Sequence, residues 1–136
     1  MAVADRMGSE GWKALGTVPG GWFENSEFIR IDGKWYLFAT DKMHLPFLRE
    51  MQGTGDRDED WINWGAFKRL HIPLQGFNTE ERANCSYLID LRSQDGYFYL
   101  LYSGRNQGLF HEGDKHFKLA IARAKDLKKW EPAGKE

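Results

Sequence analysis

Short apolar runs rich in aromatic residues alternate with polar segments along this chain, the pattern that predicts β-strands joined by turns. Residues 28–31 and 34–40 are two such runs. Asp32-Gly33 between them favours a two-residue hairpin, because Asp and Gly tolerate the positive φ angles of a type I′ turn. Residues 87–91 and 97–102 predict a second hairpin with a longer loop.

Each hairpin is followed by two more candidate strands. They lie at residues 43–51 and 64–72 in the first half, and at 117–124 and 130–133 in the second. Polar segments that contain glycine, at 52–60 and 104–115, are predicted to be connections. Helical periodicity is weak: residues 122–129 have the composition for one turn, and no segment sustains a 3.6-residue period.

The two halves of the chain repeat one another. Each contains an apolar strand, an Asp-Gly pair, an aromatic-rich strand, a long excursion and an Asp-x-x-x-Trp ending; the final tryptophans, Trp64 and Trp130, are 66 residues apart (130 − 64). A strand-built repeat of this size is typical of propeller blades. We therefore predict an all-β, β-propeller-like domain over 1–136. It would have four-stranded antiparallel blades at about 22–72 and 81–134, plus an N-terminal strand near 12–16.

Two blades do not close a propeller, since propellers usually contain about four to eight. Two alone would leave sheet faces and edges open, which favours self-association. We expect either a homo-oligomer or a fragment of a larger propeller.

Composition narrows the classes of partner. Aromatic residues make up 15% of the chain, and its net charge of −1 has no basic block that would indicate nucleic-acid binding. No run approaches the ~20 apolar residues of a membrane span. Residues 1–12 contain no apolar segment typical of a signal peptide, so we expect a cytosolic protein without a membrane partner. Cys85 is the only cysteine, which excludes an intrachain disulfide and predicts a buried strand position.

The segment from Trp22 to Thr40 resembles the five-bladed propeller glycosidases, the relatives of invertase, levansucrase and arabinanase. The stretch 32–38 (DGKWYLF) matches a strand phrase of the levansucrase-like members, and 119–132 matches a closing "Asp-Leu-x-x-Trp" phrase that these blades share. The resemblance implies a propeller fold and a carbohydrate substrate or ligand. No cofactor and no metal follow from it.

The resemblance also implies a general acid. Glycosidic cleavage needs one carboxyl group to protonate the leaving oxygen and a second carboxylate to attack or to activate water. Glu24 lies nine residues before Gly33, where the family places its acid, and Trp22 and Phe23 beside it would raise its pKa if the pocket were dry. The alternative is an exposed carboxylate at the start of a strand. Glu81 is a second candidate, because residues 81–84 spell the levansucrase-like Glu-Arg-Ala-Asn.

One departure from the family is large. Its nucleophile and its stabilising aspartate each precede a proline, whereas the four prolines here follow Val18, Leu45, Ile72 and Glu131. A single copy is therefore expected to be inactive, and whether the protein is an enzyme stays open. The two hypotheses are a glycoside hydrolase-like protein, incomplete as one chain, that acts on or binds carbohydrate, and a non-catalytic carbohydrate-binding or assembly module.

Sugar binding also uses aromatic platforms, since the C–H face of a sugar ring packs on an aromatic ring while polar groups take its hydroxyls. The candidate contacts are Trp22, Trp61, Tyr102, Arg105 and Asn106. The alternative for any of these aromatic rings is the core between blades.

The sequence signals for a metal site are weak. Residues 56–60 alternate acids as a calcium loop does, but Trp61 stands where the sharp turn needs glycine. His111 and His116 lie in a glycine-bearing segment without a helix to align them. We expect no metal site, and we expect His44 and His71 to be structural.

Overall fold

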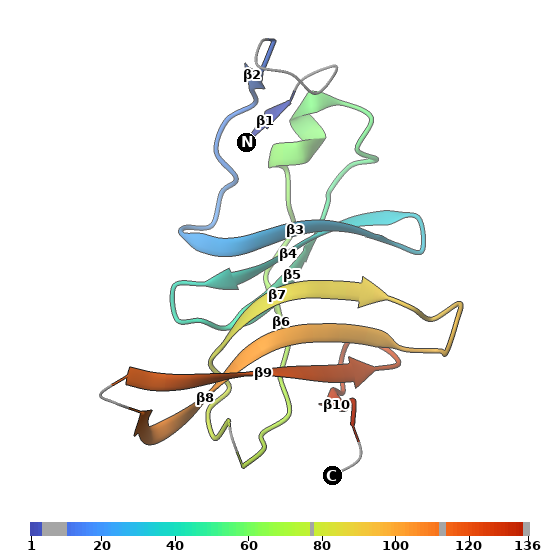
Figure 1. Cartoon of the computed structure of the whole chain (residues 1–136). Helices are drawn as coiled ribbons and strands as arrows, with labels where there is room; N and C mark the ends of the chain where they lie inside the picture. The colour runs from blue at the N-terminus through green and yellow to red at the C-terminus, as the bar shows by residue number, and fades with distance from the viewer. Residues whose placement is uncertain (4–10, 77, 112–113, 135–136) are drawn as a thin grey trace.

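The computed structural model describes residues 1–3, 11–76, 78–111 and 114–134. Within these ranges the chain forms two four-stranded antiparallel sheets and a two-stranded ribbon, together with one short 3₁₀ helix (Figure 1). The predicted all-β architecture with two propeller-like blades is confirmed. None of the described helical segments has the length and apolar character needed to cross a lipid bilayer.

The first sheet is a meander of β3 (Phe23–Ile31), β4 (Lys34–Asp41), β5 (Pro46–Glu50) and β6 (Lys68–Arg69). Asp32 and Gly33 have φ angles of 50° and 82°, as a type I′ hairpin requires. The segment between β5 and β6 contains the 3₁₀ helix η1 (Asp58–Ile62), which begins inside the predicted polar connection 52–60 and extends beyond it. The buried carboxylate of Asp60 organises this loop by accepting hydrogen bonds from the N–H groups of Gly55 and Arg57.

The second sheet repeats the meander with β7 (Ala83–Asp90), β8 (Phe98–His111), β9 (Asp114–Ala124) and β10 (Glu131–Pro132). The prediction that residues 104–115 form a connection is wrong. Backbone pairing of β8 with β9 continues past Gly104 to the pair His111↔Asp114. No helical turn forms at 122–129, because Asp126 Oδ1 accepts the N–H groups of Lys128 and Lys129 and holds a bend.

The N-terminal strand pairs locally. Residues Lys13–Ala14 (β2) form a ribbon with Ala2–Val3 (β1), in the register Ala2↔Ala14. Lys13 Nζ lies 2.6 Å from Asp58 Oδ2, an ion pair that links the ribbon to η1. The predicted strand is therefore present, but it is not part of a four-stranded blade.

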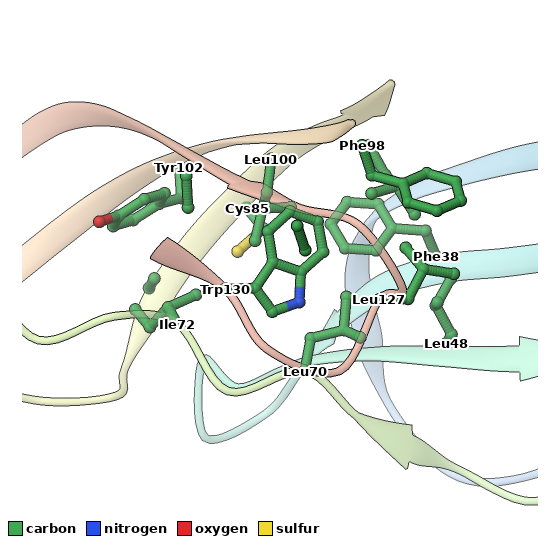
Figure 2. Packing of buried hydrophobic residues seen from close by; sticks show 14 of the residues in the cluster. Phe38, Leu48, Leu70, Ile72, Cys85, Phe98, Leu100, Tyr102, Leu127 and Trp130 are labelled. Atoms are coloured by element: carbon green, nitrogen blue, oxygen red, sulfur yellow. The ribbon is translucent and has the colours of Figure 1, made fainter. Parts of the chain in front are cut away.

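The two sheets pack face to face around one apolar cluster. Phe38 and Leu48 of the first sheet meet Leu100 and Phe98 of the second (Figure 2). Trp130, from the connection into β10, lies in the same cluster. A fully buried side chain of this kind contributes about 1.5–3 kcal/mol relative to an exposed one, so this contact is the main source of tertiary stability.

A smaller cluster covers the opposite face of the first sheet. Leu37 and Phe47 pack there against Val18 of the N-terminal segment and Trp64 of the β5–β6 connection. Arg49 is buried beside them, and its guanidinium donates hydrogen bonds to the backbone carbonyls of Gly65, Trp64 and Pro19. The face of the first sheet that turns away from the second is thus covered in part within the chain.

Candidate functional site

Glu24 lies at a β-bulge at the start of β3. The pairing of β3 with β4 shifts between Glu24 and Glu27, and Asn25 adopts a φ of 54°. Glu24 pairs with Thr40, and Thr40 Oγ1 accepts the Cys85 N–H of the second sheet at 3.4 Å. Since directly paired residues share a face of the sheet, the Glu24 side chain turns toward the second sheet.

His44 brings the two sheets together at this position. Its ring Nδ1 lies 3.2 Å from Glu24 Oε1 and 2.8 Å from Oδ1 of Asn84 on β7. Its backbone carbonyl accepts the Ala83 N–H at 2.8 Å. His44 thus joins the candidate acid to the second sheet, a contact that agrees with the expected structural role.

The turn that presents His44 is built by one aspartate. Asp41 Oδ1 accepts the N–H groups of Met43 at 2.8 Å and Leu45 at 3.0 Å, and His44 between them has a φ of 60°. A positive φ is uncommon outside glycine and is stabilised here by the side-chain-to-backbone bonds of the turn. The local sequence therefore directs the imidazole toward the bulge of β3.

The cluster formed by Glu24, His44 and Asn84 can both accept and donate hydrogen bonds. The Asn84 amide oxygen only accepts hydrogen bonds, so His44 Nδ1 is the donor in its bond to Asn84, and the Glu24 carboxylate beside it is an acceptor. The His44 and Glu24 side chains are partly exposed, so the cluster is open to solvent. Such a group of polar atoms can bind hydroxyl groups.

Glu81, the second candidate acid, contacts His71 and not the cluster of Glu24, His44 and Asn84. Its Oε1 is 3.1 Å from His71 Nδ1, and both side chains are exposed. The tetrad 81–84 still contributes, through Asn84 rather than through its glutamate. The tetrad itself was the sequence signal for Asn84, whereas His44 had no signal beyond the preceding Asp41.

The predicted flanking of Glu24 by aromatic rings is not formed. Phe23 packs edge-on against Phe47, on the opposite face of the first sheet. Trp22 borders a groove of about 410 Å³ on that same side, together with Phe28 and Leu37. Trp22 and Glu24 therefore belong to opposite sides of the first sheet.

The remaining predicted sugar contacts are dispersed. Trp61 packs against Phe28 and Trp35 and lines a smaller cavity of about 210 Å³ next to the groove. Tyr102 is buried between the sheets, where its hydroxyl accepts a hydrogen bond from Gln75, so it has no ring face open to a sugar. Arg105 and Asn106 belong to β8 by their backbones, and their side chains lie outside the described part of the structure.

Other chemistry-bearing groups are committed to the fold. Burial raises the pKa of the Cys85 thiol far above its usual value, which keeps it in the protonated, unreactive form. Asp60, from the acidic run 56–60, is held by backbone N–H groups and has a lowered pKa. Among the described residues there is no group of three or more potential metal ligands. The pair His111 and His116 falls where side chains are not described.

Comparisons with known proteins show the fold. No protein-family model matches the chain, and no curated protein matches it. Among solved structures it is similar to Bacteroides ovatus xyloglucan PUL GH43B, a five-bladed β-propeller glycoside hydrolase, with a TM-score of 0.56 and 17% identity. The match covers 92% of this chain and 21% of that one, so the chain spans about a fifth of that protein's length. The chain therefore has the blade architecture of a β-propeller and shares it with part of a glycoside hydrolase.

Proposed function

We propose that this chain is a carbohydrate-binding part of a glycoside hydrolase-like propeller, with Glu24, His44 and Asn84 as the contacts to sugar hydroxyls. The observation that carries the proposal is the meeting of Glu24 and Asn84 on one histidine ring, at 3.2 and 2.8 Å from Nδ1. These two residues come from the two segments whose sequences resemble the family's acid motifs. The similarity in fold to a xyloglucan-related protein supports carbohydrate as the ligand class.

Binding is favoured over hydrolysis by the single chain. Hydrolysis requires a second carboxyl group, about 5–5.5 Å from the acid in retaining enzymes and about 6.5–9.5 Å in inverting ones. In the described contacts Glu24 is paired with a histidine, and Glu81 with another histidine. The sequence contains no Asp-Pro pair. One acid with a histidine partner can bind and orient a sugar but lacks the group that completes cleavage.

The binding proposal is tested by calorimetric titration of the whole chain with xyloglucan oligosaccharides. Glu24→Gln and Asn84→Ala should each weaken binding about tenfold, because a hydrogen bond that involves a charged or buried polar group is worth about 1.4 kcal/mol or more. Glu81→Gln is the matched control, since it changes the same chemistry outside the cluster, and should bind like the parent protein. Equal affinity of all three variants would refute the assignment of the site.

Hydrolysis is the second candidate, favoured by the partly exposed carboxylate of Glu24 at a position that the resemblance assigns to an acid. In this case another chain or blade would supply the second carboxylate. Reducing-sugar release should then depend on Glu24, so that Glu24→Gln abolishes it while oligosaccharide binding is kept. Release that persists in Glu24→Gln would remove Glu24 from the chemistry.

A further inference from the structure

The β-bulge in β3 places two carboxylates on one face of the first sheet. Glu24 and Glu27 are three residues apart (27 − 24), a spacing that puts side chains on opposite faces of a regular strand. Here the pairing with β4 moves from Thr40, opposite Glu24, to Phe38, opposite Glu27, so β3 contains one extra residue. Thr40 and Phe38 both face the second sheet, which Thr40 contacts through its hydroxyl and Phe38 through its ring. The bulge therefore turns Glu27 toward the second sheet together with Glu24.

The second sheet presents backbone N–H groups to this face. Its edge strand β7 lies beside the first sheet (Figure 1). Successive N–H groups of an antiparallel strand point alternately toward one side and the other, so those of Ala83 and Cys85 point away from β8. A bulge between Cys85 and Tyr87 then shifts the alternation by one residue. The next N–H group that points toward the first sheet is for this reason that of Leu88 instead of Tyr87.

Each of these three N–H groups has an acceptor in β3, in β4 or in the turn after β4. In chain order, Ala83 donates to the His44 carbonyl at 2.8 Å, Cys85 to Thr40 Oγ1 at 3.4 Å and Leu88 to Glu27 Oε2 at 2.9 Å. We call these three bonds the inter-sheet ladder. Glu27 supplies its charged acceptor, and a hydrogen bond to an ionised group is roughly twice as strong as one between neutral groups. The bond from Leu88 is therefore the strongest of the three.

The other end of the inter-sheet ladder lies at the cluster of Glu24, His44 and Asn84. Ala83, whose N–H binds the His44 carbonyl, directly precedes Asn84, whose Oδ1 accepts the bond from the His44 ring. The distance between Asn84 and Glu24 thus depends on how β7 is held against β3. Bulges are frequent next to functional sites, where they redirect a side chain, and here two of them bring Glu27 and the Leu88 N–H together.

We propose that Glu27 is a positioning residue for this cluster. Its carboxylate binds the backbone of β7 and thereby holds Asn84 at the His44 ring, opposite Glu24. Glu27 itself is partly buried, and its Oε2 is occupied by the Leu88 N–H, so it acts through Asn84 and not by contact with a ligand. The consequence for sugar binding rests on the proposed function, whereas the inter-sheet ladder can be tested without a sugar.

A second polar link between the sheets provides the matched control. Arg92 donates to the Asp32 carboxylate at 2.8 and 3.1 Å, and it lies beyond the far end of β7 from Asn84. Loss of this link removes a contact between the two sheets without touching the inter-sheet ladder. If Glu27 only added stability, Arg92→Ala and Glu27→Ala would affect the cluster alike. Positioning requires that Glu27→Ala alone affects it.

The first experiment is amide hydrogen exchange, followed by NMR, on the whole chain without sugar. Glu27→Ala should speed exchange of the Leu88 N–H about tenfold, the ratio for one hydrogen bond to a charged acceptor. It should also speed exchange of the Ala83 N–H at the cluster. Glu27→Gln should restore both, because its amide oxygen can accept the same bond. Parent-like exchange of Ala83 in Glu27→Ala, or faster exchange of Ala83 in Arg92→Ala, would overturn the proposal.

The second experiment measures binding of xyloglucan oligosaccharides by calorimetric titration. Glu27→Ala should weaken binding by up to about tenfold, the loss expected for Asn84→Ala, while Glu27→Gln and Arg92→Ala should bind like the parent protein. In the Asn84→Ala background Glu27→Ala should have no further effect, because Glu27 acts through Asn84. Additive losses would show that Glu27 acts by another route, against the proposal. A parent protein that binds no sugar would refute the carbohydrate site alone, and the exchange of Ala83 would still decide the role of Glu27.

Discussion

Phe38→Ala tests whether the two sheets share one closed core. Phe38 is 0% exposed at the centre of β4 and packs in the cluster between the sheets. Removing a fully buried phenylalanine side chain costs about 3–5 kcal/mol, the sum of lost transfer free energy and the cavity left behind. Domains of this size have a total unfolding free energy of about 5–15 kcal/mol. The variant should therefore lose about a fifth or more of the free energy of unfolding.

Urea denaturation followed by tryptophan fluorescence, at one fixed protein concentration, measures this loss. The midpoint should fall while the slope m stays constant, since the surface exposed on unfolding is nearly unchanged. Phe67→Ala is the control: Phe67 is 48% exposed and packs against Phe47 on the partly covered face of the first sheet. Its loss should be about 1 kcal/mol, in proportion to its smaller burial. A Phe38→Ala cost equal to that of Phe67→Ala would refute a closed core between the sheets.

Three further predictions concern the hairpins and the thiol. Arg92→Ala removes ion pairs with Asp90 and with Asp32 of the other sheet, and it should lower the free energy of unfolding by less than about 1 kcal/mol, as for exposed ion pairs. The difference between the two proteins should shrink in high salt. Hydrogen bonds from Arg92 lower the pKa of Asp90, so this contribution is present at neutral pH and is lost as the pH falls below about 4; acid titration of both proteins checks it. Gly33→Ala should lower the free energy of unfolding by about 1–2 kcal/mol, measured in thermal melts, because the φ of 82° at Gly33 is unfavourable for a residue with a side chain. Cys85 should resist alkylation at pH 8 until urea unfolds the chain, whereas rapid labelling of the native protein would contradict its burial.

The candidate site could be predicted only in part. The sequence indicates Glu24 by its separation along the chain from the Asp-Gly turn, and the tetrad 81–84 by its residues Glu-Arg-Ala-Asn. The contact between them passes through His44, which is 20 residues (44 − 24) from one and 40 residues (84 − 44) from the other. Pairings at such separations depend on how two sheets dock, and no local pattern encodes them. Tyr102 illustrates the same limit, since only packing decides which strand face is buried.

Local chemistry along the chain determined the strands and their turns. Asp32-Gly33 can adopt the two positive φ angles of a tight hairpin, and alternating apolar runs can pair without information from elsewhere. The repeat of Asp-Gly turns and Asp-x-x-x-Trp endings likewise indicated two equivalent blades. These features depend on neighbouring residues, so the sequence alone was sufficient to predict them.

Only the tertiary structure decided which face of each blade is covered. Phe38 and Leu101 occupy equivalent positions, yet Phe38 is fully buried whereas Leu101 is partly exposed on the face of the second sheet that turns away from the first. The difference arises because the second sheet covers the face of the first sheet that carries Phe38, whereas no sheet formed by the described residues covers the face of the second sheet that carries Leu101. The side chains of both blades are suited to burial, but burial requires a partner surface, and the position of that surface is a property of the assembled fold.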